Sequence, residues 1–448
     1  MEIVITELSR YFIAILMALY TYWGFRTFAA KKKKKARLVR KQKMIMYLFH
    51  FLGYAIIYLN EMNTTILGLY GCELLFLIVF GVVYKHLYQR ENQPIICHMQ
   101  MLFSISMVML GRLNLDSAKH QFLYMLIGMV VCLLLPWVLE HYTKLELDGW
   151  FYAVLGVIIL LVVLFFGNEK YGAKNWLTLG PVVLQPSEFV KILFVFAFAS
   201  ILSHEALNFH NVVKISAMAA VFVLILVLEK DLGGAVIFFI CYLFMLFVAT
   251  GQAVYLLGGL LSGSGAAVAA YFLFSHVRTR VIAWRDPWST INNQGYQVAQ
   301  SLFAIGTGGW FGMGLTQGMP KTIPIRESDF IFAAIAEELG VFFSICLILV
   351  YLICFIWFIN VTVKVKKTFY KLVTLGFSVI IMFQTFLTLG GVTKFIPSTG
   401  VTLPLVSAGG SSVLSMIFMF CTIASINLIN SKEVEENVVE QTQESEGE

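Results

Sequence analysis

The residues of this chain best suited to chemistry lie between Ser275 and Phe330. The segment reads SHVRTRVIAWRDPWSTINNQGYQVAQSLFAIGTGGWFGMGLTQGMPKTIPIRESDF, with apolar stretches on both sides. Only 13% of the whole chain is charged. Eight charged residues nevertheless gather here among aromatic residues and glycines: Arg278, Arg280, Arg285, Asp286, Lys321, Arg326, Glu327 and Asp329. Carboxylates can accept protons and basic side chains can hold anions, so we expect the reactive groups here.

Asp286 is the leading candidate for a general base. It lies between Arg285 and Pro287 and beside Trp284 and Trp288. This setting restricts the backbone and should partly shield the carboxylate. An aspartate that only stabilises a type I turn would have similar neighbours, so the pattern leaves both roles open.

Other polar groups interrupt the apolar stretches. In GAKNWLTLGPVVLQPSEFVK, Pro186 is expected to open a helix, and the spacing of Glu188 and Lys191 puts both on one helical face. Exposure of charges to lipid is costly, so this pair should face a cavity or each other, either as a binding site or as a structural ion pair. In EKDLGG, Asp231 is expected to cap the following helix, and Asp329 is expected to cap another.

The glycines between 306 and 318 resemble a phosphate-binding loop only superficially. The two usual glycine-rich nucleotide-binding patterns are missing from the sequence, and no strand is expected before these glycines, which argues against nucleotide binding. Residues 397–415, PSTGVTLPLVSAGGSSVLS, read as a proline-broken hairpin that enters the last apolar stretch. Non-helical backbone at membrane depth needs protein or water around it.

The composition indicates that lipid surrounds most of this protein. Of its 448 residues, 59% are hydrophobic and 15% aromatic, more than a water-soluble core of ordinary proportions can hide. Spans must satisfy their backbone polar groups internally, which favours helices. We therefore predict an all-α, polytopic transmembrane bundle with thirteen spans: 10–28, 43–60, 64–86, 96–112, 121–140, 150–167, 187–203, 211–228, 232–250, 253–274, 330–359, 368–390 and 408–430.

Positive charge predicts the orientation in the membrane. The run KKKKKARLVRKQK, residues 31–43, should remain cytoplasmic. Alternation then places the N-terminus and loop 275–330 outside, and the loops near 85–90 and 364–371 and the C-terminal tail inside. We expect the basic run to touch anionic membrane lipids and not nucleic acid, because no DNA-binding motif accompanies it. The acidic tail, 431–448, is expected to be disordered.

The seven cysteines are expected to pack in the core. Most of them lie inside predicted spans, their spacing does not suit a metal site, and the pattern gives no reason for them to pair.

Four blocks of the sequence, in order, resemble the SEDS proteins of bacteria, the shape, elongation, division and sporulation group that includes RodA, FtsW and SpoVE. The blocks are QPSEFVK, DLGG, RDPW…GYQ…GGWFGMGL…SDFIFAAIAEELG and PSTGVTLPLVSAGGSS. The resemblance implies a ten-helix SEDS-like core at 95–430, about three extra N-terminal spans at 1–94, and the tail. It also implies a peptidoglycan glycosyltransferase of the bacterial cytoplasmic membrane that polymerises lipid II, usually with a class B penicillin-binding protein.

Roles for individual residues follow from this resemblance. It implies that Asp286 is the catalytic base and that Glu188, Lys191, Asp231 and Ser407 contribute to the substrate-binding cavity. On charge alone we add Arg278, Arg280 and Lys321 as groups that could hold a departing pyrophosphate. A divalent cation, Mg²⁺ or Mn²⁺, could assist them, and no tightly bound cofactor is expected.

The chain departs from the family pattern at three places. It has Asn175 after Lys174 where an arginine often precedes the tryptophan, Glu229-Lys230-Asp231 where Q-P-D is common, and Ala408 where a tyrosine is usual. Two other functions remain open. A lipid II flippase would use the same cavity without a base at Asp286, and a non-catalytic scaffold of the cell-wall machinery would tolerate loss of Glu188 and Asp286. The choice among division, elongation and sporulation also stays open.

Overall fold

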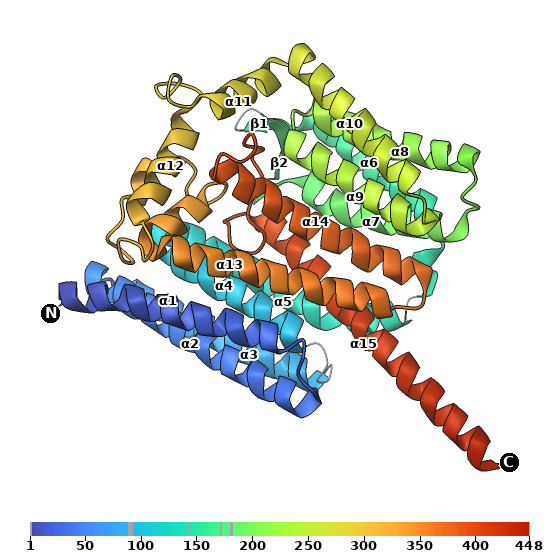
Figure 1. The fold of residues 1–448 in the computed structure, drawn as a ribbon, viewed down its shortest axis with the longest axis horizontal. Helices are drawn as coiled ribbons and strands as arrows, with labels where there is room; N and C mark the ends of the chain where they lie inside the picture. The colour runs from blue at the N-terminus through green and yellow to red at the C-terminus, as the bar shows by residue number, and fades with distance from the viewer. Residues whose placement is uncertain (1, 88–92, 142, 171–172, 180–181, 448) are drawn as a thin grey trace.

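The protein is a bundle of long helices (Figure 1). The computed structural model describes residues 2–87, 93–141, 143–170, 173–179 and 182–447, and part of the loop expected near 85–90 lies outside these ranges. The elements are α1 (Glu2–Arg26), α2 (Lys32–Glu61), α3 (Thr64–Leu87), α4 (Gln93–Leu113), α5 (Leu115–His141), η1 (Thr143–Glu146), α6 (Gly149–Phe166), β1 (Asn168–Lys170), β2 (Ala173–Leu179), β3 (Val182–Leu184), α7 (Pro186–His204), α8 (Phe209–Leu228), α9 (Leu232–Thr250), α10 (Ala253–Leu273), α11 (Ser275–Arg285), α12 (Tyr296–Gly308), η2 (Pro320–Thr322), α13 (Ile331–Lys364), α14 (Thr368–Val392) and α15 (Gly410–Gly447).

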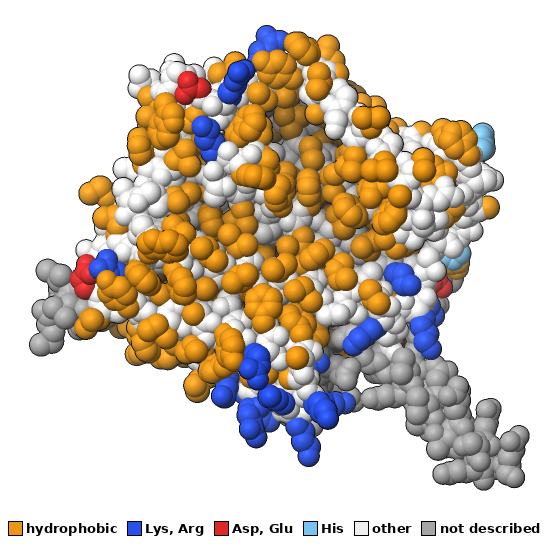
Figure 2. Space-filling model, viewed as in Figure 1, with side chains coloured by type: hydrophobic (Ala, Val, Ile, Leu, Met, Phe, Trp, Pro, Cys, Tyr) orange, Lys and Arg blue, Asp and Glu red, His pale blue; other side chains and the backbone are white. Residues whose placement is uncertain are grey.

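Within the described residues, twelve helices are long and apolar enough to cross a membrane: α2–α10 and α13–α15. This confirms the predicted polytopic helical bundle. The remaining predicted segment, 10–28, forms most of α1, which carries Arg10 and Arg26 and is not among the twelve. Figure 2 shows the result on one face, where a broad apolar surface is bordered below by a dense group of Lys and Arg side chains.

The structure adds a small sheet to the predicted all-α fold. The order is β1-β2-β3, and both pairings are antiparallel, with Leu177 opposite Leu184 and Thr178 opposite Val183. Valine, threonine and tryptophan are enriched in strands, which suits the sequence of β2 and β3. The segment before Pro186 is therefore a β-meander, which the polar character of its sequence did not reveal.

Two segments are more helical than expected. The 275–330 segment contains α11, α12 and the short η2. The acidic tail was expected to be disordered, but it continues α15 as far as Gly447 and projects from the bundle in Figure 1. Glutamate and glutamine favour helices, and the span before the tail has already nucleated the helix, which explains the continuation.

Helix α4 lies in the middle of the bundle, and its spanning window is completely buried. It is hydrogen-bonded to each of the three preceding helices. Tyr20 of α1 donates to the carbonyl of Cys97 at 3.2 Å, and the His50 ring of α2 lies 3.2 Å from Ser104 Oγ. Gln100 donates to the carbonyl of Leu77 in α3 at 2.7 Å. The three N-terminal helices therefore pack as part of the bundle.

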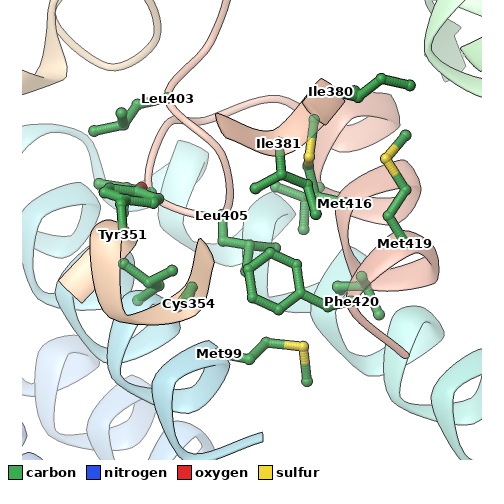
Figure 3. Packing of buried hydrophobic residues seen from close by; sticks show 14 of the residues in the cluster. Met99, Tyr351, Cys354, Ile380, Ile381, Leu403, Leu405, Met416, Met419 and Phe420 are labelled. Atoms are coloured by element: carbon green, nitrogen blue, oxygen red, sulfur yellow. The ribbon is translucent and has the colours of Figure 1, made fainter. Parts of the chain in front are cut away.

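The predicted hairpin enters the bundle between α14 and α15. We call residues 393–409 the hairpin segment. Its Leu403 and Leu405 are buried among side chains of α13, α14 and α15 (Figure 3), and Tyr351 donates to the carbonyl of Pro404 at 2.7 Å. Protein surrounds this non-helical backbone, as its depth requires.

One expectation about cysteines was wrong. Cys132 of α5 and Cys421 of α15 form a disulfide, with their Cα atoms 5.4 Å apart. The two residues are 289 positions apart in the sequence, so their spacing could not reveal the pairing. Both side chains are fully buried, and the bond joins the helices on which they lie.

Candidate functional site

A buried ion pair lies at the start of α7. Pro186 occupies the first turn, as predicted, and Lys191 Nζ lies 2.8 Å from Glu188 Oε1. Glu188 is only 6% exposed and Lys191 only 2% exposed. Gln384 Oε1 accepts from Lys191 at 2.8 Å, and Ser415 Oγ donates to Glu188 Oε2 at 2.9 Å. Both charges therefore face each other and further polar groups inside the protein.

A second polar cluster forms around Asp231. This residue caps α9, as predicted, by accepting from the N–H of Gly234 at 2.9 Å. Its second carboxylate oxygen accepts from Asn175 Nδ2 at 3.1 Å. Asn175 comes from β2, so the small sheet supplies part of this cluster. One of the positions at which the sequence departs from the family pattern therefore contacts a predicted site residue.

Arg280 joins this cluster from α11. Burial lowers the pKa of Arg280, while the carboxylates of Asp231 and Asp329 act in the opposite direction. Arg280 Nη1 donates to the carbonyl of Ser398 at 3.2 Å. Arg280 and Asp329 both approach Gly400 in the hairpin segment. A Cβ built on this glycine would lie 3.6 Å from Arg280 Nη2 and 3.7 Å from Asp329 Oδ2. Two carboxylates therefore act electrostatically on a guanidinium that is bonded to the hairpin segment.

Asp329 does not cap α13, contrary to the prediction. Phe330 occupies the cap position, and the carboxylate of Asp329 instead accepts from Ser328 Oγ at 3.0 Å. Burial raises the pKa of Asp329, although the hydrogen bond and Arg280 oppose this shift. Its carboxylate bonds the neighbouring Ser328 and feels the positive charge of Arg280, and does not take the capping role that its sequence position suggested.

Asp286 lies at the end of α11 with its carboxylate exposed to solvent. One carboxylate oxygen accepts from the N–H groups of Trp288 and Ser289, each at 3.2 Å. These bonds form a local turn. Hydrogen bonds from Ser289 lower the pKa of Asp286, with smaller contributions from the N–H of Trp288 and the positive charge of Lys394. The expected shielding was wrong, because Trp288 is itself 48% exposed.

The hairpin segment fixes the position of this turn. Trp284 Nε1 donates to the carbonyl of Lys394 at 3.1 Å, one turn after Arg280 bonds Ser398. These contacts hold one face of α11 against the hairpin segment and leave Asp286 at the exposed end of the helix. The base candidate is therefore positioned by residues more than a hundred positions further along the chain.

Three predicted site residues lie away from these groups. Arg278 is exposed, donates to the carbonyl of Phe272 at 3.1 Å and packs over the ring of Tyr271. Lys321 is exposed in η2. Ser407 is 1% exposed, and its hydroxyl donates to the carbonyl of Ser328 at 2.6 Å and accepts from a backbone N–H. The surroundings of Ser407 indicate a role in holding the hairpin segment.

The glycine-rich segment packs against a break in α13. Gly340 interrupts that helix with φ 87° and ψ 165°. Met313 and Gly314 donate to the carbonyls of Glu337 and Glu338, at 2.9 and 3.0 Å. Backbone atoms of Gly312 and Gly340 approach so closely that neither position has room for a Cβ. The glycines therefore permit backbone contact, which explains their density without a bound phosphate.

Two charged residues near the candidate site are not predicted by their local sequence. Lys394 is half-buried and helps to lower the pKa of Asp286, although it lies 108 positions later in the chain. Glu229 is fully buried, and burial, followed by repulsion from Asp231, raises its pKa to about 8. The position of Lys394 just before the PSTG motif was a possible signal. Glu229 stands where the chain departs from the family pattern, which gives no sign of its burial.

The side chains near Asp286 and Asp231 offer few ligands for a metal ion. Within the described residues, no group of three or more His, Cys, Asp or Glu side chains could hold a metal ion. Asp231 and Asp329 could supply at most part of a coordination shell. A divalent cation here would need most of its ligands from substrate oxygens or water, an arrangement that Mg²⁺ commonly adopts.

Known proteins resemble this chain over most of its length. Residues 92–432 match the family model FTSW_RODA_SPOVE, described as cell cycle protein. The peptidoglycan glycosyltransferase RodA of Mycobacterium bovis is 32% identical over 387 residues, which cover 79% of this chain and 82% of that protein. An FtsW protein of Saccharophagus degradans is 33% identical over 375 residues, covering 78% of this chain and 95% of that protein.

Solved structures agree with these relatives. A chain of a peptidoglycan synthase complex that coordinates polymerization and crosslinking has a TM-score of 0.66 and 25% identity, covering 75% of this chain and 97% of its own. RodA of Thermus thermophilus, with a TM-score of 0.57, 23% identity and coverage of 74% and 95%, supports the fold alone. Because the family model extends over most of the sequence and these relatives do likewise, this chain belongs to the FtsW, RodA and SpoVE family of cell cycle proteins.

Proposed function

We propose that this protein is a peptidoglycan glycosyltransferase that polymerises lipid II into glycan strands. The family membership and the names of its relatives support the reaction class. The observation that carries the proposal is the position of Asp286, whose accessible carboxylate is held in a fixed turn beside Lys394. Glycan polymerisation needs a proton acceptor for a sugar hydroxyl and positive charge for the pyrophosphate that leaves.

Asp286 accepts the proton of the attacking hydroxyl in this proposal. Its lowered pKa means that the carboxylate is ionised at neutral pH, although a low pKa also makes a weak base. A bound sugar would displace water from the carboxylate and raise its pKa, because loss of water disfavours the charged form. Substrate binding thus increases the basicity of Asp286 when proton transfer is required.

Charge development on the leaving pyrophosphate calls for cations. Lys394 acts on Asp286 electrostatically, and Arg280 lies on the same helix as the turn, so both are suited to this role. The buried Glu188–Lys191 pair instead holds α7 to α14 and α15 through Gln384 and Ser415. A divalent cation would add charge at the pyrophosphate, with Asp231 and Asp329 as its protein ligands.

The proposed setting is the bacterial cytoplasmic membrane, with the N-terminus and residues 275–330 outside and the C-terminus inside. The positive charges in 31–43 support this orientation. The likeness to a chain of a peptidoglycan synthase complex supports a class B penicillin-binding protein as the partner.

The direct test is polymerisation of lipid II by purified protein in nanodiscs, with and without candidate class B penicillin-binding proteins. We expect glycan strands whose yield increases with the correct partner. Lipid II translocation is measured in parallel with proteoliposomes. Translocation without polymerisation under any partner condition would replace the enzyme by a flippase, and absence of both activities would favour a scaffold.

A further inference from the structure

A basic pocket lies between the end of α1 and the start of α2, far along the chain from Asp286. Its volume is about 490 Å³, and it is lined by Tyr22, Trp23, Arg26, Lys33, Lys34, Arg37, Leu38 and Lys41. Among these described lining residues, five are basic and none is acidic. The family match begins at residue 92, so the pocket lies wholly in the N-terminal extra helices.

Helix geometry concentrates these charges. Lys33, Arg37 and Lys41 are spaced four residues apart and therefore lie on one face of α2. Arg26 faces them from α1, where it donates to the hydroxyl of Tyr22 at 2.8 Å. Lys33 and Arg37 form no ion pair with any residue in the described parts of the chain. Close like charges repel one another, so the pocket favours an anionic ligand.

Aromatic residues accompany the basic groups of the pocket, a combination that suits the level of lipid head groups. Lys41 Nζ lies 4.8 Å from the centre of the Trp23 ring, and Tyr22 is 54% exposed. Tryptophan and tyrosine are typical of the interface between membrane and water. From Tyr22, exposed apolar side chains continue along α1 at helical spacing: Phe12, Ile15 and Leu19. A ligand in the pocket can therefore place its phosphate among the basic groups and its acyl chains along α1.

We propose that this pocket binds the head group of an anionic membrane phospholipid and favours a head group with two phosphates. Five positive charges exceed what one phosphate can neutralise, and the apolar surface of α1 distinguishes a lipid from a soluble phosphate. This assignment rests on the charge and shape of the pocket and does not depend on the proposed glycan synthesis. The pocket is formed by α1 and α2, and both helices are hydrogen-bonded to α4. Lipid binding therefore stabilises the N-terminal part of the bundle.

The experiment compares two charge-matched variants of the full-length protein. Lys33→Gln with Arg37→Gln removes two pocket charges. Lys31→Gln with Arg40→Gln removes the same two residue types from the same basic run outside the pocket lining. Binding is measured by native mass spectrometry and by thermal shift in detergent, with titrations of diphosphatidylglycerol, phosphatidylglycerol, phosphatidylcholine and inorganic pyrophosphate.

We expect wild-type protein to bind diphosphatidylglycerol more tightly than phosphatidylglycerol, and phosphatidylcholine weakest. The pocket variant should lose roughly thirtyfold in affinity for diphosphatidylglycerol, while the control pair keeps wild-type affinity. An equal loss in both variants would reduce the effect to general surface charge and overturn the proposal. Pyrophosphate that binds as tightly as the lipid would assign the pocket to a soluble phosphate, and no preference among the lipids would also refute it.

Discussion

At the residue scale, Asp286 provides the sharpest test of the proposed chemistry. Asp286→Asn retains the volume of the side chain but removes its ability to accept a proton. We expect a loss of polymerisation of roughly 10²–10⁴-fold, with folding and lipid II binding nearly unchanged. The matched control is Asp116→Asn, another highly exposed aspartate, which should retain wild-type activity. Wild-type glycan yield from Asp286→Asn would exclude this residue as the base.

The buried Glu188–Lys191 pair predicts strong coupling between two substitutions. Glu188→Gln or Lys191→Met alone leaves an uncompensated charge in the core, a change that typically costs about 3–5 kcal/mol. The double variant removes both charges and should be less destabilised than the sum of the singles. The coupling is measured by thermal unfolding in detergent of the wild type, the two single variants and the double variant. Additive effects would show that the 2.8 Å contact contributes no interaction energy.

Glu229 predicts a pH dependence of stability with a definite sign. Its folded-state pKa of about 8 lies above the ordinary value of 4.5, so the folded protein binds the proton more tightly than the unfolded chain. Stability from this group is fully present below about pH 4.5 and is lost as the pH rises towards 8.

Glu229→Gln imitates the protonated form at every pH. It should therefore raise the melting temperature at pH 8.5 and leave it nearly unchanged at pH 5. Melting curves of both proteins at the two pH values decide the matter, with exposed Glu169→Gln as the control. An equal shift at both pH values would contradict the titration of Glu229.

At the scale of elements, the break in α13 predicts opposite outcomes for two glycines. Gly340→Ala forces a side chain into positive φ and against the backbone of Gly312, so we expect a severe loss of folded protein. Gly306→Ala adds a methyl group to α12 where nothing lies within 4 Å, and should stabilise by up to about 1 kcal/mol. Yields and melting temperatures in detergent test both. A well-folded Gly340→Ala protein would mean that the segment 309–314 does not require the break.

Features that depend on neighbouring residues were predictable from the sequence. Pro186 at a helix start, Glu188 and Lys191 on one face and Asp231 as a cap all follow from spacing within a few residues. Long apolar segments likewise identified the twelve spans. These features required no knowledge of distant contacts.

Features that depend on distant segments could not be predicted from the sequence. The influence of Lys394 on Asp286, the contact of Arg280 with Ser398 and the break at Gly340 each join elements that are separate in the sequence. Asp329 was expected to cap a helix, but its carboxylate bonds the hydroxyl of Ser328 and also feels the charge of Arg280, which is distant in the sequence.

At the scale of the whole molecule, the orientation in the membrane is open to direct measurement. Ser289 is exposed beside Asp286, so Ser289→Cys should react with a membrane-impermeant maleimide in intact cells. Lys366→Cys, in the exposed connection between α13 and α14, should react only after the membrane is permeabilised. Both variants are made with Cys72 replaced by serine, because Cys72 is the exposed free cysteine among the described residues. Labelling with the reverse pattern would invert the proposed topology.

The burial of α4 has a consequence for how this chain could be shortened. The family match begins at residue 92, which suggests at first that α1–α3 could be deleted to leave a minimal functional unit. Yet Cys97, Gln100 and Ser104 form their hydrogen bonds with those helices. Without them, a helix bearing polar groups would face hydrocarbon, which is energetically costly. Deletion of α1–α3 should therefore destabilise α4, although the family match does not include those helices.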